Sequence, residues 1–169
     1  NADAVAWFLK EIWPRIRARL GDGVEFYHGG TITGDLLSAL PGGGWRALGN
    51  VADPEPVYNQ CRVFIAPTRF SAGIPLKVCS AAARGVPCVV SAHLADQLGW
   101  RRDEEVLTAP TGDAEAFAEA CVRLHTDEKL WQSIRERALV RMQAEFSPDA
   151  FRESIRQSLA SVVNTSRAG

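Results

Sequence analysis

The chain has 169 residues, of which 46% are hydrophobic and 23% are charged, and its formal net charge is −1. This length suffices for one domain with a full core, and the balanced charge argues against a nucleic-acid-binding or anionic-lipid-binding surface. No apolar run approaches the ~20 residues that span a bilayer, so we expect a cytoplasmic protein that in its full-length form is peripheral to the membrane.

Short apolar runs alternate with helical periodicity along the chain. The pattern predicts, in chain order, a helix at 3–20 that is kinked or restarted at Pro14, a strand at 24–28, a helix at 34–40, a weak strand at 45–48, a short helix at 54–60, strands at 62–66 and 87–91 around a helix at 75–84, a short helix at 94–98, a strand at 105–108, and helices at 114–125, 128–145 and 148–163. Such alternation is typical of βαβ units, so we predict a doubly wound, Rossmann-like α/β domain with a parallel sheet and a helical C-terminal tail. The near-continuous apolar run at 62–66 predicts a strand covered on both faces.

The cysteines and histidines show no metal-ligand spacing. The cysteines stand far apart among apolar neighbours, at Cys61, Cys79, Cys88 and Cys121. This predicts buried free thiols in a reducing compartment. We expect neither a bound metal nor a cofactor.

The segment with the most chemical information is a predicted strand, loop and helix at 62–84. Its loop contains Ser71, Ala72 and Gly73, whose small side chains let a ligand approach the backbone. Pro75 suits the first turn of the helix, where its missing N–H costs nothing. The free amides of that turn and the helix dipole predict an anion site.

Helical spacing places Lys77, Ser80 and Arg84 on one face of this helix. A lysine in a first turn is disfavoured by the helix dipole, unless an anion such as a diphosphate lies nearby. An ordinary surface lysine is the alternative interpretation of Lys77.

The sequence resembles the C-terminal domain of the retaining glycosyltransferases of the GT-B fold, known as group 1 or family 4. RFSAGIPLKVCSAAARGVPCVVS is similar to the family signature G-x-G-I-x-x-K-x-x-E-A-x-A-x-G-x-P-V-V. The segments DAVAWFLKEIWPRIRARL, LGNVADPEPVYNQCRVFIAP and EAFAEACVRLHTDEKLW look like the family's first helix, its glycine turn with the following helix and strand, and its closing helices. The resemblance thus covers nearly the whole chain.

The resemblance implies a nucleoside-diphosphate sugar as donor substrate and a transferase of polysaccharide biosynthesis. The backbone of Ala72, Gly73 and Ile74 would face the diphosphate and the sugar, and Lys77 would lie near the phosphates. The turn formed by Gly49, Asn50 and Val51 would border the nucleobase. No catalytic residue is assigned.

Two positions depart from the family pattern of two glutamates eight residues apart. Ala72 stands at the first and Ser80 at the second, which would hold the ribose hydroxyls. A serine forms only a neutral hydrogen bond where a carboxylate forms a charge-assisted one. Donor binding is therefore weakened, another residue replaces the glutamate, or the domain is degenerate.

The chain also starts at the family's first helix rather than at the strand and phosphate loop that precede it. We expect residues 1–169 to be a single donor-binding domain excised from a longer protein, with Asn1 and Ala2 left from a tag. One half of a GT-B fold lacking its first strand would need another domain to hold an acceptor glycan or lipid-linked glycan. We expect the sheet to close by pairing 24–28 with 62–66, or an intermolecular contact near the N-terminus.

Three functions remain open at this point: a glycosyltransferase module, a degenerate non-catalytic module for nucleotide-sugar binding or assembly, and an epimerase of the same fold. Ala72 and Ser80 favour the second, whereas Gly73, Lys77 and the glycine and proline at 85 and 87 favour the first.

Overall fold

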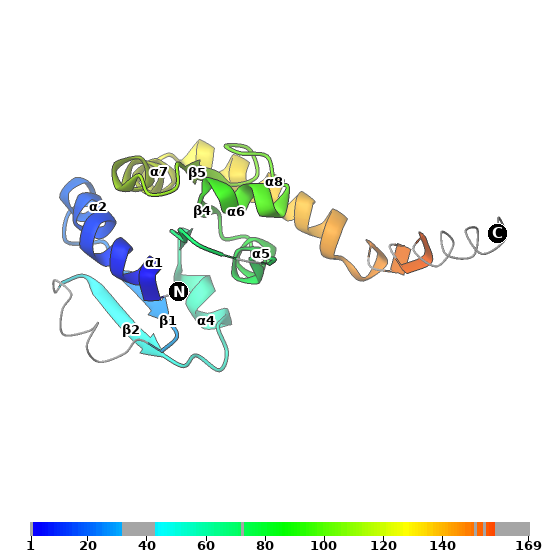
Figure 1. Cartoon of the computed structure of the whole chain (residues 1–169), viewed down its shortest axis with the longest axis horizontal. Helices are drawn as coiled ribbons and strands as arrows, with labels where there is room; N and C mark the ends of the chain where they lie inside the picture. Colours follow the sequence, from blue (N-terminus) through cyan, green and yellow to red (C-terminus); the bar gives the residue numbers. More distant parts are fainter. Residues whose placement is uncertain (1, 32–42, 72, 151, 154, 158–169) are drawn as a thin grey trace.

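The computed structural model describes residues 2–31, 43–71, 73–150, 152, 153 and 155–157. Helices and strands alternate as the sequence predicts (Figure 1). In chain order they are α1 (Ala2–Trp7), the π-helix η1 (Phe8–Ile12), α2 (Trp13–Leu20), β1 (Phe26–Gly29), β2 (Trp45–Gly49), α4 (Glu55–Gln60), β3 (Phe64–Ala66), α5 (Leu76–Ala83), β4 (Cys88–Ser91), α6 (Ala92–Leu98), β5 (Leu107–Ala109), α7 (Ala114–Thr126) and α8 (Glu128–Phe146). The predicted helix at 34–40 and the end of the one at 148–163 lie outside the described residues.

All the described strands pair in parallel, in two sheets of order β1–β2 and β3–β4–β5. Within the described ranges β1 pairs only with β2 and β3 only with β4, so the predicted closure of the sheet between 24–28 and 62–66 is wrong. The Phe26 ring instead packs against Phe8, with ring centroids 4.5 Å apart, and against Trp13, at 5.9 Å. These aromatic contacts fix β1 beneath η1 and α2.

Helices cover both faces of the three-stranded sheet, which confirms the doubly wound α/β fold. The central strand β4 is buried throughout. Val89 faces a core built with η1, α2 and α7, whereas Cys88 and Val90 face a second core built with α5, α6 and α8. β3 is only half-buried because it lies at the edge of its sheet. The predicted cover on both faces nevertheless holds for β3, because Ile65 packs against the first core while Phe64 and Ala66 pack against the second.

Several helix ends follow the local chemistry of the sequence. The π-turn precedes Pro14, which lies in the first turn of α2 and cannot donate a backbone hydrogen bond. Gly85 ends α5 with φ +73°, a left-handed conformation that suits glycine. The Ser147 hydroxyl accepts from the Ala150 amide at 3.1 Å and so caps the start of the helical segment that follows.

The cysteines are free thiols, as predicted, and three of them are buried while Cys61 is half-buried. Burial raises the pKa of the Cys88 and Cys121 thiols, so neither is a reactive thiolate. None of the helices in the described part of the chain combines the length and apolar character that a membrane span requires.

Candidate functional site

The described residues of the loop between β3 and α5, 67–71 and 73–75, lie at the carboxyl ends of the three parallel strands. The loop follows β3 directly, and Ser71 is hydrogen-bonded to Gln97 of α6, the helix that begins where β4 ends. His93 of α6 in turn contacts Thr111, which comes just after β5. This edge of an open parallel sheet is where ligands of α/β domains bind.

Gly73 and Gly49 are two of the glycines with open backbone at the strand ends; Gly112, directly after Thr111, is another. Gly73 in the loop has φ +84°, and Gly49 at the end of β2 has φ +66°. A Cβ added at either position would meet no atom of the described chain within 4 Å. Glycine adopts these conformations without strain and leaves room for a ligand to approach the main chain.

The turn of Gly49, Asn50 and Val51 lies at the carboxyl ends of β1 and β2. The Gly30 amide donates to the Gly49 carbonyl at 2.7 Å. A Cβ added at Gly29 would lie 3.5 Å from Cγ2 of Val51. Asn50 is exposed. The loops after β1 and β2 are therefore packed together, as the ones after β3, β4 and β5 are.

Lys77 lies in the first turn of α5. Its side chain is exposed, and its ammonium lies close enough to His28 of β1 to lower the pKa of that imidazole, although burial is the larger cause. Within the described residues, His28 Nδ1 is buried without a hydrogen-bond partner. His28 was not selected as a site residue from the sequence. Its position near the end of a predicted strand, directly before Gly29 and Gly30, is the sequence feature that could have indicated it.

The start of α5 differs from the prediction of free amides. The Leu76 amide donates to the Ile74 carbonyl at 2.9 Å, and the Val78 amide donates to the Pro75 carbonyl at 2.9 Å. These amides are satisfied within the chain. The anion site at this helix start stays a prediction, and it would rely on the Lys77 side chain more than on free backbone amides.

Farther along α5, Ser80 and Arg84 share the face of Lys77, as the helical spacing predicts. Arg84 Nη1 donates to the Ser80 carbonyl at 3.0 Å, and its guanidinium lies over the Tyr58 ring of α4, 5.2 Å from the centroid. Ser80 is half-buried. Ala72, the other position that departs from the family pattern, lies outside the described residues.

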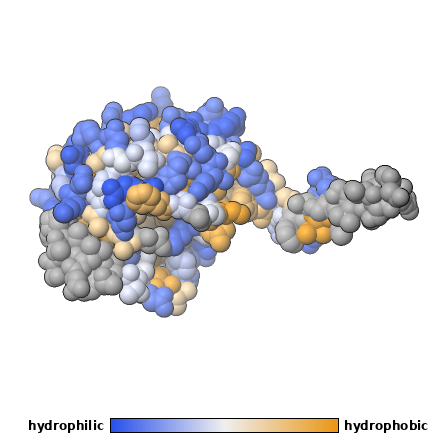
Figure 2. All heavy atoms as spheres, in the orientation of Figure 1, coloured by the Kyte–Doolittle hydropathy of each residue, from blue (hydrophilic) through white to orange (hydrophobic). Residues whose placement is uncertain are grey.

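Apolar side chains are exposed beside the loop. Phe70 is 78% exposed, Ile74 65% and Leu76 64%. Most of the surface seen in Figure 2 is hydrophilic, with separate hydrophobic patches. Within the described ranges no three His, Cys, Asp or Glu side chains converge to hold a metal ion; a metal-independent reaction stays a prediction.

A family model described as "Glycosyl transferases group 1" matches residues 1–127. The chain belongs to this family. Within it, membership of family 4 and a retaining reaction remain expectations from the resemblance. No curated protein matches this group 1 glycosyltransferase chain.

Solved structures show the same fold at low sequence identity. Sucrose-phosphate synthase from Thermosynechococcus elongatus is 23% identical with a TM-score of 0.61, and the match covers 72% of this chain and 31% of that one. HepE from Anabaena, in complex with UDP and glucose, is 14% identical with a TM-score of 0.65, and the match covers 92% of this chain and 55% of that one. A glycosyltransferase from Rickettsia africae is 14% identical with a TM-score of 0.70, and the match covers 95% of this chain and 45% of that one. This glycosyltransferase chain thus spans less than two thirds of each of these proteins.

Acidification is expected to destabilise the chain as the pH falls through about 6.5, the ordinary pKa of a histidine. Burial lowers the pKa of His28 and His125, with smaller effects of Lys77 and Arg62. Because the unfolded chain then binds protons at a higher pH than the folded chain, the free energy of unfolding falls as the pH drops below about 6.5. Urea denaturation at each pH measures it.

The variant His125→Gln should flatten part of this pH dependence. The paired carboxylates, whose pKa values are lowered, titrate at a lower pH and so leave this window to the imidazoles. A free energy of unfolding that stays constant or rises on acidification would contradict the prediction.

Proposed function

We propose that the chain binds a nucleoside-diphosphate sugar and helps transfer the sugar, with retention, to an acceptor held by an N-terminal domain. The carrying observation is the open backbone of Gly73 and Gly49 at the carboxyl ends of the strands, with the exposed Lys77 in the first turn of the helix that follows Gly73. Membership of a glycosyltransferase family and the UDP-glucose bound to Anabaena HepE support the proposal.

The residues at the carboxyl ends of the strands each have a role in this proposal. The backbone of 72–74 faces the diphosphate and the sugar, and the turn of Gly49, Asn50 and Val51 borders the nucleobase. Lys77 stabilises the negative charge that develops on the leaving diphosphate, without a bound metal. The acceptor is a glycan or lipid-linked glycan, as in cytoplasmic polysaccharide biosynthesis.

Calorimetric titration of the full-length protein with UDP, GDP and ADP, each alone and as its glucose conjugate, tests the proposal. We expect one nucleotide series to bind, and transfer from its sugar conjugate to require the acceptor domain, because aligning two substrates supplies about 7–11 kcal/mol of the barrier. No binding of any series at millimolar concentration would overturn the proposal. Binding without transfer from any donor would favour the non-catalytic module that Ser80 also suggests.

The variant Ser80→Glu should keep or improve nucleotide affinity. A carboxylate at this position accepts charge-assisted hydrogen bonds from ribose, worth about 1–2 kcal/mol more than those of serine, or about 5- to 30-fold. Arg84, four residues on and already bonded to the Ser80 carbonyl, competes for the new carboxylate and reduces the gain.

Calorimetry of Ser80→Glu beside Ser80→Gln separates charge from size at this position. The glutamate variant should bind the nucleotide at least as tightly as the glutamine variant. A large loss of affinity in Ser80→Glu alone would show that this residue does not face the ribose.

A further inference from the structure

The main-chain carbonyl and the side chain of Ser71 are both held by one residue of another element. Gln97 Nε2 donates to the Ser71 carbonyl at 3.2 Å, and the Ser71 hydroxyl donates to Gln97 Oε1 at 2.8 Å. A carboxamide is required for this pairing, because it offers a donor and an acceptor side by side. Gln97 therefore fixes the backbone two residues before Gly73.

His93 extends this contact to a third strand end. Its Nε2 lies 3.4 Å from the Ser71 hydroxyl oxygen, and its Nδ1 lies 3.1 Å from Thr111 Oγ1. Because the Ser71 hydroxyl gives its proton to Gln97, the network is consistent with a neutral imidazole that donates from Nε2 and accepts from Thr111. The loop after β3, the helix after β4 and the turn after β5 are joined in one chain of hydrogen bonds.

The opposite side of the loop is anchored to the first helix. Arg69 is paired with Asp3, and its guanidinium lies over the Trp7 ring, 5.3 Å from the centroid. The loop is thus held from α1 on one side and from α6 on the other. Gly73 follows two residues after the second anchor, and a Cβ added there would meet no atom of the described chain within 4 Å.

We propose that Gln97 is a positioning residue for the donor: with His93 it holds the loop backbone at Ser71 in the arrangement that lets the diphosphate bind near Gly73. This inference rests on the proposed function. A preformed loop spares the donor the entropy cost of ordering it, and this gain appears in donor affinity. Gln97 is exposed and contributes little to the core, so its replacement should affect the loop rather than the fold.

The test compares Gln97→Leu with Gln132→Leu in the full-length protein. Gln132 is also exposed and hydrogen-bonded, to Glu128 on α8, so it controls for the loss of a surface carboxamide. In Gln97→Leu we expect faster amide hydrogen exchange at 67–74 and about 5-fold or greater loss of affinity for UDP, or for whichever of UDP, GDP and ADP the wild type binds. Gln132→Leu should change neither.

Further variants separate positioning from a general structural effect. Thr111→Val should weaken donor binding in the same direction, and Thr111→Ser, which keeps the hydroxyl, should restore it. Unchanged exchange or unchanged donor affinity in Gln97→Leu, with a wild type that binds, would overturn the positioning role alone. A wild type that binds none of the three nucleotides would overturn the proposed function and this role with it.

Discussion

Replacing Lys77 with alanine is expected to weaken nucleotide binding about 10- to 150-fold, because a hydrogen bond to a charged phosphate contributes about 1.5–3 kcal/mol. The ammonium lies in the first turn of α5, where nearby backbone amides are already satisfied by Ile74 and Pro75. The side chain is therefore the main positive group that this helix start offers. Calorimetry with UDP, GDP and ADP at fixed ionic strength measures the loss.

Lys129 provides a matched control for this substitution. It is an exposed lysine at the second position of α8, as Lys77 is at the second position of α5. Lys129→Ala should leave nucleotide affinity unchanged, and Lys77→Arg should retain most of it. Equal affinities of Lys77→Ala and the wild type would mean that Lys77 is an ordinary surface residue.

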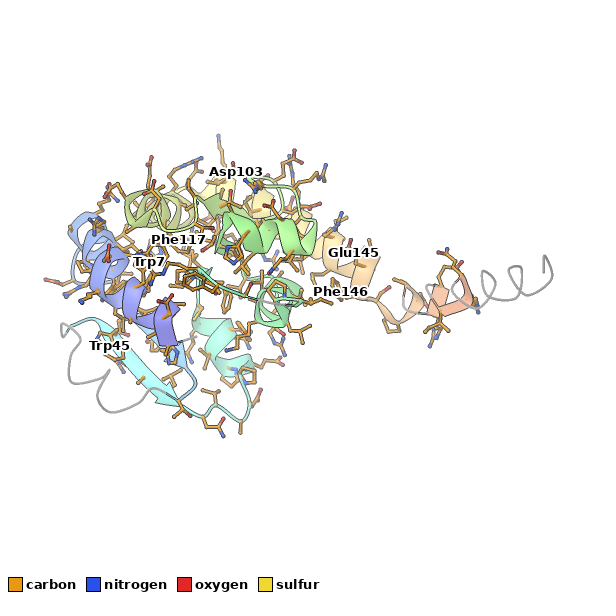
Figure 3. All side chains as sticks on the ribbon, in the orientation of Figure 1. Trp7, Trp45, Asp103, Phe117, Glu145 and Phe146 are labelled. Atoms are coloured by element: carbon orange, nitrogen blue, oxygen red, sulfur yellow. The ribbon has the colours of Figure 1, made fainter. Side chains whose placement is uncertain are left out.

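Replacing Phe117 with alanine is expected to lower the free energy of unfolding by about 3–5 kcal/mol, the usual cost of removing a large aromatic side chain from a core. Phe117 of α7 is 0% exposed and packs edge-on against Trp7 of α1, with ring centroids 6.2 Å apart. Figure 3 shows the two side chains together between these helices. Urea denaturation monitored by circular dichroism measures the change.

Phe70→Ala removes the same side chain from a position that is 78% exposed, and it should change the free energy of unfolding by less than about 0.5 kcal/mol. Similar losses in both variants would contradict the packing described for Phe117. Because Trp7 also supports Arg69 of the loop, the Phe117 core and the candidate site share one helix.

The candidate site was predicted from the sequence to the extent that its chemistry is local. Gly73 and Lys77 lie at the predicted sheet edge because a strand, a loop of small residues and a helix follow one another within a short segment. His28, Gln97 and Thr111 were missed. His28 lies in β1, Gln97 in α6 and Thr111 after β5. No local sequence spacing relates residues of these elements to the loop after β3.

The sequence by itself determined which segments are helices and strands, because apolar periodicity, glycine stops and proline starts act over a few residues. It also determined the parallel, doubly wound arrangement, because short apolar runs alternate with helical segments along the chain. Only the tertiary structure decided that the strands form two sheets rather than one, that β3 lies half-exposed at an edge, and that Gln97 holds Ser71. Each of these depends on contacts between segments that are distant in sequence. An example is the packing of Phe26 of β1 against Phe8 of η1 and Trp13 of α2, which no local sequence pattern predicts.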